Sequence, residues 1–208
     1  MRISYAIPVC NEHIELEKLL YILHKHIDKE DEIIIQCDQG NTTPEVYKVL
    51  DIWHKAGGPL KVIEFPLKGN FASFKNNLKN NCTGDWIFQI DADELPHKSL
   101  ITNLKDLLKL NPTTELFLVP RVNTVEGITP ENINKWRWNV DDKGRVNWPD
   151  YQTRIIQNSP KIQWASKVHE VITGMSTNAF LPKEEEWCLY HHKHIDKQEF
   201  QNKFYDTL

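Results

Sequence analysis

The chain has 208 residues and a formal net charge of −4 at pH 7, and 40% of its residues are hydrophobic. This length supports one complete hydrophobic core, so we expect a single domain over residues 1–208. The weak negative charge gives no general reason to expect nucleic-acid binding, and no apolar run approaches the length that spans a bilayer. The four cysteines are scattered and the N-terminus lacks the apolar stretch of a signal peptide, so we expect a cytoplasmic protein with reduced cysteines.

Strand-like and helix-like segments alternate over the first 120 residues. Apolar and β-branched runs predict strands at residues 3–9, 32–37, 60–65, 85–90 and 116–119. Between these runs, apolar residues at helical spacing predict helices. The alternation predicts a parallel sheet that is covered by helices on both faces.

Residues that favour helix starts set the expected boundaries. Asn11 is expected to cap the first helix, and Thr43 followed by Pro44 to open the second. The helix after the fourth strand is expected to begin at about Pro96.

The second half of the chain changes character. We expect a loop over residues 123–135 and then a β-hairpin, in which residues 136–140 and 145–148 pair across a glycine-containing turn. Further short strands are expected at residues 154–157, 161–164 and 187–191. Finally, Phe200, Phe204 and Leu208 recur at helical spacing after Ile195, which predicts a closing amphipathic helix.

The stretch Asp91-Ala92-Asp93-Glu94 directly follows the strand predicted at residues 85–90. If the backbone stays extended, Asp91 and Asp93 can point the same way. Paired carboxylates suit Mg²⁺ or Mn²⁺, which complete their coordination with phosphate oxygens and water. A solvated acidic turn before a helix is the simpler interpretation. However, ligands of parallel sheets bind beyond the carboxyl ends of the strands, and this rule gathers residues 8–12, 38–40 and 68–75 along the same rim.

The order and spacing of several short segments resemble glycosyltransferase family 2, whose members have the GT-A fold. These segments are Ile7-Pro8-Val9-Cys10-Asn11-Glu12, Asp38, Asn70-Phe71, Phe74-Lys75-Asn76, Asp91-Ala92-Asp93-Glu94, Asp150-Tyr151-Gln152-Thr153-Arg154, Lys167-Val168-His169-Glu170 and Leu189-Tyr190-His191-His192-Lys193. The later half is most similar to small bacterial and phage members that carry a V-H-E segment and a late histidine.

The resemblance implies a three-layer α/β/α fold with a central, mostly parallel sheet and a C-terminal extension made of a β-hairpin and a helix. It implies that residues 1–120 bind a nucleotide-diphosphate sugar, most often a UDP-sugar, and that residues 121–208 bind the acceptor. The donor-binding residues that it implies are Pro8, Val9, Cys10, Asn11, Glu12, Asp38, Lys68, Asn70, Phe71, Lys75, Asp91 and Ala92. Family members often have a second acidic residue after Asp38, where this chain has Gln39.

The same resemblance implies roles for the metal and the base. Asp93 is expected to bind Mn²⁺ or Mg²⁺, with Asp91 beside it and leaning toward the ribose. A late histidine, His191 or its neighbour His192, is expected to complete the metal shell, and only one of them can face the metal if the segment is a strand. Glu170 is the expected general base. Two other carboxylates stay open as bases, Asp150 and Glu94, and the second of these is alternatively expected to cap the next helix.

Simple electrostatics is consistent with this assignment. A divalent ion held by Asp93 would neutralise the leaving diphosphate, and Lys75 would add a positive charge in a cleft of low dielectric constant. A carboxylate on the far side of the sugar would take the proton of the attacking hydroxyl. Direct displacement with one such base inverts the anomeric centre.

The acceptor that we expect is a saccharide. Basic and aromatic residues alternate between residues 135 and 154, however, and such a mixture is used to recognise single-stranded or flipped bases. A hydroxymethylated base of phage DNA is therefore the alternative acceptor. The residues that would contact it are Trp136, Arg137, Trp138, Arg145 and Trp148.

Two functions of another class use the same features. A metal-dependent phosphoesterase or nuclease could place its ion at this acidic strand end, but such sites usually gather more carboxylates or histidines around two metals. A non-catalytic nucleotide-binding module is the other alternative. It would tolerate the loss of Glu170, whereas a transferase would not.

Overall fold

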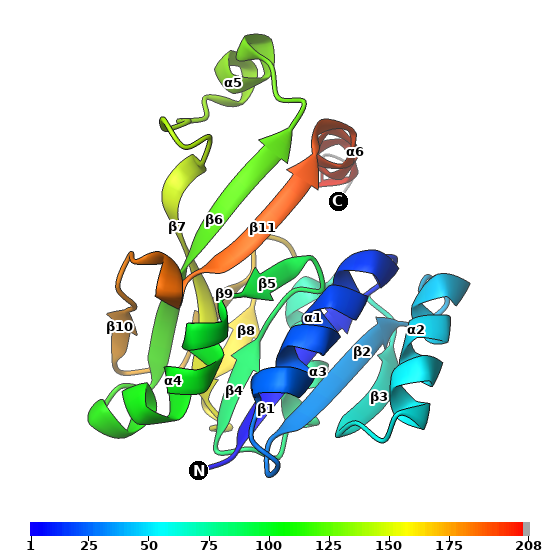
Figure 1. The fold of residues 1–208 in the computed structure, drawn as a ribbon, viewed down its shortest axis with the longest axis vertical. Helices are drawn as coiled ribbons and strands as arrows, with labels where there is room; N and C mark the ends of the chain where they lie inside the picture. The colour runs from blue at the N-terminus through cyan, green and yellow to red at the C-terminus, as the bar shows by residue number, and fades with distance from the viewer. Residues whose placement is uncertain (206–208) are drawn as a thin grey trace.

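A mixed β-sheet forms the centre of the computed structural model, which describes residues 1–205 (Figure 1). Within these residues the sheet has nine strands in the order β3-β2-β1-β4-β7-β6-β11-β5, with β10 paired to β6. The strands are β1 (Ile3–Val9), β2 (Glu32–Asp38), β3 (Leu60–Phe65), β4 (Trp86–Gln89), β5 (Glu94–Pro96), β6 (Leu116–Glu126), β7 (Val146–Gln157), β10 (Asn178–Phe180) and β11 (Leu189–His194). A separate small sheet pairs β8 (Gln163–Ala165) with β9 (Val171–Thr173).

Strands β3, β2, β1 and β4 are parallel to one another, as the alternation of strands and helices predicts. Strand β7 is antiparallel to both β4 and β6, whereas β11 is parallel to β6. The helices are α1 (His13–His26), α2 (Pro44–Lys55), α3 (Phe71–Asn80), α4 (Lys98–Leu110), α5 (Pro130–Trp136) and α6 (Ile195–Tyr205). None of the helices in this described part combines the length and the apolar character that a membrane span requires.

Two apolar clusters cover the two faces of the sheet. On one face, Tyr5 and Ile7 of β1 pack with residues of α1, α2 and α4. On the other face, Ala6 of the same strand packs with α3 and with the β8–β9 sheet, through Leu78 and Trp164. This alternation along β1 follows the two-residue period of a strand and confirms the expected three layers.

The start of α1 differs from the expectation. The helix begins at His13 with Glu12 as its N-cap residue, so the assignment of Asn11 as the cap is wrong. The Glu12 carboxylate instead accepts hydrogen bonds from the backbone N–H groups of Cys10 and Asn11, both at 3.0 Å. No side chain caps α1. A missing cap costs about 1 kcal/mol, and each fully buried leucine of the helix contributes about 1.5–3 kcal/mol, so burial decides that the helix forms.

The region expected to be a loop and a hairpin also folds differently. Strand β6 continues to Glu126, and residues 130–136 form α5. A capping box starts this helix, since Thr129 Oγ1 accepts from the N–H of Asn132 and the Asn132 side chain accepts from the N–H of Thr129. The expected hairpin is reduced to one bridge between Val140 and Val146.

Three boundaries near the acidic stretch and the C-terminus are also shifted. Helix α4 begins at Lys98 rather than Pro96, because residues 94–96 pair with β11 as strand β5. His97, and not Glu94, caps this helix by accepting from the N–H of Ser99. Strand β11 begins at Leu189, after a 3₁₀ turn.

Helix α6 follows β11, as expected from Ile195 onward. Phe200 is 70% exposed, however, so its predicted packing as the inner face of an amphipathic helix is wrong. Leu208 and the side chain of Phe204 lie outside what the structure describes.

Candidate active site

The carboxyl ends of β1, β2, β3 and β4 meet at one edge of the sheet, and the loops after them are tied together there. Asp38, at the end of β2, is 5% exposed. Its carboxylate accepts from the N–H of Leu67 at 2.9 Å and from the side chain of Asn41 at 3.0 Å. Asp38 therefore joins the loops that follow β2 and β3, at the place where the donor was expected.

Two of the expected donor-binding residues have side chains in the core. Val9 and Ala92 are 3% exposed and pack in the cluster on the α1 side of the sheet, so they offer their backbone to the rim. Cys10 and Asn11 follow β1 at the rim, and burial raises the pKa of the Cys10 thiol to about 11, so this thiol is protonated at neutral pH. Pro8 lies on β1, opposite Gln36 of β2.

The loop after β3 approaches the loop that carries Glu170. Lys68 has a positive φ of 46°. Two residues later, Asn70 caps α3 by accepting from the N–H of Ser73 at 3.0 Å. The N–H of Phe71 donates to the carbonyl of Lys167 at 2.9 Å. This bond connects the start of α3 to the segment Lys167-Val168-His169-Glu170.

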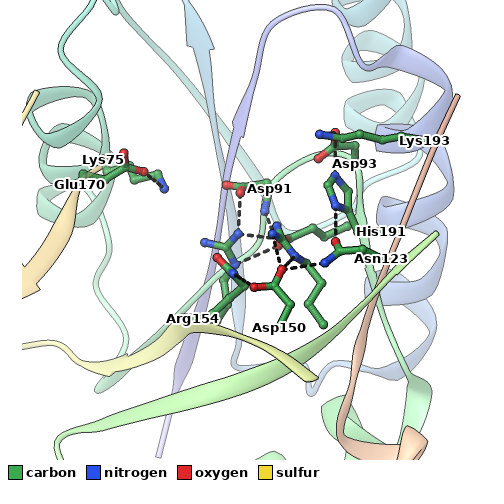
Figure 2. Close-up of polar contacts among 12 residues, drawn as sticks. Lys75, Asp91, Asp93, Asn123, Asp150, Arg154, Glu170, His191 and Lys193 are labelled. Carbon is green, nitrogen blue, oxygen red and sulfur yellow. Dashed lines mark hydrogen bonds and ion pairs between the residues drawn. The ribbon is translucent and has the colours of Figure 1, made fainter. Parts of the chain in front are cut away.

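Asp91 and Asp93 have different partners (Figure 2). The chain turns at Ala92 and Asp93, and the N–H of Glu94 donates to the carbonyl of Asp91 at 2.8 Å. The expectation that the two aspartates share one direction depended on an extended backbone, which this turn removes. Asp91 faces Arg154, whereas Asp93 faces β11 and α6.

Asp93 lies among three basic side chains. Its Oδ2 is 3.4 Å from His191 Nε2, 3.5 Å from Lys197 Nζ and 3.9 Å from Lys193 Nζ. Burial raises the pKa of Asp93, but the His191 hydrogen bond and the three positive partners outweigh burial and hold this pKa far below its usual range. Asp93 is therefore a carboxylate at any pH at which the protein functions.

His191 is the histidine that faces Asp93. It is 8% exposed, and its Nδ1 lies 2.8 Å from Asn123 Oδ1. The Asn123 amide NH₂ donates to Asp150, so its oxygen is the acceptor and His191 donates from Nδ1. Nε2 is therefore the ring nitrogen that faces Asp93. His192 points to the opposite face of β11 and contacts Thr124 at 2.7 Å.

These residues fit a divalent ion that is shared with a substrate. A histidine that binds a metal usually donates its other N–H to an oxygen acceptor, as His191 does. Two protein ligands from Asp93 and His191 leave positions for phosphate oxygens and water, which Mg²⁺ and Mn²⁺ accept readily. Within residues 1–205 there is no group of three or more side chains that could hold an ion without such help.

A buried network of charges lies below Asp91. Glu94 is 0% exposed and accepts from Arg154 Nε and Nη2 at 2.9 and 2.7 Å, and from Arg121 Nη1 at 2.8 Å. Arg154 Nη2 also donates to Asp91 at 2.6 Å. Burial lowers the pKa of Arg154, but Asp91 and Glu94 outweigh it and raise this pKa, so the guanidinium stays charged.

Asp150 belongs to the same network. Its carboxylate accepts from Arg121 Nε and Nη2 at 2.9 and 2.7 Å, and from Asn123 and Gln152, each at 2.7 Å. Burial raises the pKa of Asp150, but the charge of Arg121 and these hydrogen bonds hold it below its usual range. Both Asp150 and Glu94 therefore have permanent cationic partners.

Lys75 and Glu170 form a separate ion pair. Lys75 comes from α3 and Glu170 from the end of the loop before β9, and Lys75 Nζ donates to Glu170 Oε1. Their side chains are 9% and 16% exposed. Lys75 Nζ also lies 4.5 Å from the centre of the Trp164 ring. The pair lies on the other side of Asp91 from Asp93 in Figure 2.

The residues predicted to contact a base lie on α5, on the segment that follows it and at the start of β7 (Figure 1): Trp136, Arg137, Trp138, Arg145 and Trp148. The rings of Trp136 and Trp138 lie 4.7 Å apart, and the Arg145 guanidinium lies 4.4 Å over the ring of Trp148. Arg137 is exposed and has a positive φ of 54°. In Figure 1, this basic and aromatic tip around α5 stands away from β4 and β5, whose connecting turn carries Asp91 and Asp93.

Several residues at the site were given no role from the sequence. Arg121 and Asn123 are two residues apart on β6, so their side chains share one face of the strand. The predicted strand ended at Val119. A longer predicted strand would have placed both residues on the same face. Lys193 was quoted in a family segment without a role. Arg154 was quoted in a family segment without a role, and nothing in its neighbourhood along the chain points to Asp91.

Solved structures share this architecture. TarS residues 1–349 from S. aureus, in complex with UDP-GlcNAc, matches with a TM-score of 0.67 at 15% identity over 93% of this chain and 59% of that chain. The same protein with UDP gives 0.63 at 16% identity, over 92% and 60%. The mannosyltransferase PcManGT from Pyrobaculum calidifontis, in complex with GDP-Man and Mn²⁺, gives 0.50 at 20% identity, over 58% and 35%. The chain thus spans about 60% of the length of the TarS 1–349 structures.

These likenesses confirm the expected GT-A fold, with α5 in place of the expected loop and the expected β-hairpin reduced to one bridge, as described above. A comparison with curated protein sequences finds no match. The sequence model described as "Glycosyl transferase family 2" matches residues 4–172, which is well over half of the chain. The chain therefore belongs to glycosyl transferase family 2.

Proposed function

We propose that this protein transfers a sugar, with inversion, from a nucleotide-diphosphate sugar to a hydroxyl group of a saccharide. The observation that carries the proposal is the position of two pairs around Asp91: Asp93 with His191 on one side, and Lys75 with Glu170 on the other (Figure 2). Both pairs are close enough to act electrostatically on Asp91. Burial and Asp93 raise the pKa of Asp91, whereas Arg154 and Lys75 lower it, and the lowering prevails.

The donor is assigned to the rim formed by residues 1–120, and the acceptor to residues 121–208. The tied loops around Asp38 and Asn70 support the first assignment, since they order the edge of the sheet where ligands of parallel sheets bind. TarS was solved with UDP-GlcNAc and PcManGT with GDP-Man, and the better match to TarS favours a UDP-sugar here.

Asp93 and His191 are proposed to hold Mn²⁺ or Mg²⁺ together with the diphosphate. When bound, the ion supplies positive charge at the leaving group. Lys197 and Lys193 bring two more positive charges to the same carboxylate, at 3.5 and 3.9 Å. We therefore expect that the lysines of β11 and α6 add to the stabilisation that the ion gives the released diphosphate.

Glu170 is proposed as the general base. Asp150 and Glu94 are held by guanidinium groups, so taking up a proton would cost each of them these contacts. Glu170 is paired with an amine, and Lys75 can turn toward an incoming phosphate because its ammonium is on a flexible stem. The Glu170 carboxylate is then free to accept the proton of the acceptor hydroxyl. One base without a second nucleophile gives inversion.

A donor screen tests this function. UDP-, GDP-, CDP- and TDP-sugars are added with and without Mn²⁺, and the melting temperature is measured. A donor at 100 times its Kd stabilises by about 2.7 kcal/mol, which is a shift of about 5–10 °C for a chain of this size. We expect a UDP-sugar to give this shift only with Mn²⁺, and Asp93→Asn to remove it. The proposal fails if no nucleotide sugar changes the melting temperature.

The basic and aromatic tip favours a second acceptor, a hydroxymethylated base in DNA. The exposed Arg137 and the neighbouring, mutually tilted rings of Trp136 and Trp138 are the observations that favour it. Duplex DNA with hydroxymethylated bases would then bind with an affinity that falls as salt rises, and Trp138→Ala would weaken it. A metal-dependent nuclease is less well supported, since the described residues lack the ligand groups of a two-metal site.

A further inference from the structure

A cavity of about 310 Å³ lies between the sheet strands β6 and β7 and the small β8–β9 sheet. Lys75 and Glu170 line it together with Arg154, which reaches Asp91. Trp164 of β8 lines it too. The cavity therefore begins at the proposed base and borders the residue that holds the acidic motif. Its volume is at the lower end of the range for small-molecule sites, about 300–1,000 Å³, and suits a single sugar residue.

Without a bound donor, the charges that line the cavity are compensated. Lys75 pairs with Glu170, and Arg154 pairs with both Asp91 and Glu94. A charged ligand would have to be desolvated here without a free partner of opposite sign, and such burial is unfavourable. The lining therefore favours an uncharged ligand.

The lining of the cavity combines apolar and polar side chains. Leu116, Ile172 and Met175 form apolar parts of its wall, whereas Gln152, Thr153 and Asn178 are polar. A pyranose has a similar division, with C–H groups on its faces and hydroxyl groups around its edge. A neutral pyranoside fits this combination better than a purely apolar molecule does.

Trp164 supplies an unused donor. The residue is 6% exposed, and within the described residues its Nε1–H has no hydrogen-bond partner. Its backbone is held on both sides by Asn76, which donates to the carbonyl at 2.8 Å and accepts from the N–H at 2.9 Å. A buried donor without a partner is unusual and calls for an acceptor. Trp164 also lines a shallower groove along α3, but that groove does not include Glu170.

We propose that this cavity binds the terminal sugar of the acceptor as a neutral pyranoside, with one oxygen accepting from Trp164 Nε1. The inference rests on the proposed function. The acceptor hydroxyl lies at Glu170, which takes its proton. The hydroxyl oxygen forms the new bond to the anomeric carbon of the donor, the bond from that carbon to the phosphate oxygen breaks, and its electron pair leaves with the diphosphate.

Binding of simple glycosides tests the inference without an identified acceptor. The probes are methyl glycosides of glucose, galactose, mannose and N-acetylglucosamine, with methyl glucuronide as the charged counterpart, followed by saturation-transfer NMR. At least one neutral glycoside should bind. Trp164→Phe, which removes the donor and keeps a ring, should weaken it about three- to tenfold, the effect of one hydrogen bond. Met175→Trp, which fills the cavity, should abolish binding, and Trp53→Phe on α2 is the matched control and should change nothing.

The inference is overturned if no neutral glycoside binds, if only the glucuronide binds, or if both cavity variants bind like the wild type. The donor-induced shift in melting temperature is measured on the same variants. A normal shift in Trp164→Phe, with weaker glycoside binding, supports an acceptor site. Loss of the shift in both cavity variants assigns the cavity to the donor and overturns the inference. If no nucleotide sugar stabilises even the wild type while glycosides bind, the proposed transfer fails, and with it the acceptor role of the cavity.

Discussion

Arg154 Nη2 lies 2.6 Å from Asp91 Oδ2, so the first aspartate of the acidic motif is held by a residue of β7. Arg154 is 3% exposed, and the same guanidinium also binds the fully buried Glu94. Asp91 is consequently fixed before any ligand binds. The motif divides into a structural part that faces Arg154 and a part, Asp93, that faces β11 and α6.

Removal of the Arg154 guanidinium should destabilise the fold strongly. Arg154→Met would leave Glu94 with only Arg121 as its cationic partner. Asp91 would lose its hydrogen bond to β7. Breaking a buried pair from one side costs about 3–5 kcal/mol, because an uncompensated charge stays buried. The free energy of unfolding is measured by urea denaturation.

The matched control for this variant is Lys109→Met, which breaks an exposed ion pair with Asp106 on α4. Exposed pairs contribute about 0–1 kcal/mol, so the control should stay near the wild type. Equal stability of the two variants would show that the network does not stabilise the fold.

Replacing Glu170 should remove turnover and spare donor binding. Glu170→Gln keeps the size of the side chain but cannot take a proton, and the loss of a general base reduces the rate about 10²–10⁴-fold. Turnover is followed as release of the nucleotide diphosphate, and donor binding as the shift in melting temperature. A variant that turns over normally would point to another base or to a non-catalytic nucleotide-binding module.

How far the sequence predicts this fold depends on the range of the contacts involved. The period of two residues in β1 and the leucine spacing of α1 are local, and both elements lie where they were predicted apart from the start of α1. The capping box at Thr129 is local too, and Thr129-Pro130 before Asn132 could have predicted α5. The expectation of a loop there overlooked this signal.

The candidate site depends on contacts between distant residues. Asp93 meets His191, and Asp91 meets Arg154, from strands that are far apart in the chain. The family resemblance pointed to His191 but not to Arg154. The turn at Ala92 separates the two aspartates, and it forms because Glu94 must pair with β11, which the local sequence does not indicate.

Asp150 should contribute a stability that depends on pH. Its pKa in the folded protein is below the unfolded value of about 3.9, so it stabilises the fold above that pH and this contribution is lost as the pH falls through the folded pKa. Asp150→Asn should therefore lower the free energy of unfolding by about 1–3 kcal/mol near neutral pH, because Arg121 loses a charged partner. The Asp150 side chain is a quarter exposed, so the loss stays below that of a fully buried pair. Urea denaturation at several pH values should show the difference from the wild type shrinking below about pH 4. A difference that is constant down to pH 2 would contradict this role of the charge.

His191 and His192 are adjacent in β11 and face opposite sides, so each is the natural control for the other. His191→Ala should remove a nitrogen ligand, and we expect the Mn²⁺ concentration that half-saturates the donor-induced thermal shift to rise at least 10-fold. Asn123→Ala removes the hydrogen-bond acceptor of His191 Nδ1. It should raise this Mn²⁺ concentration about 10–100-fold, which is the usual effect of losing a residue that orients a metal ligand. His192→Ala should leave it unchanged, because its side chain is 64% exposed and contacts Glu126. An equal effect of both histidine variants would place the ion elsewhere than between His191 and Asp93.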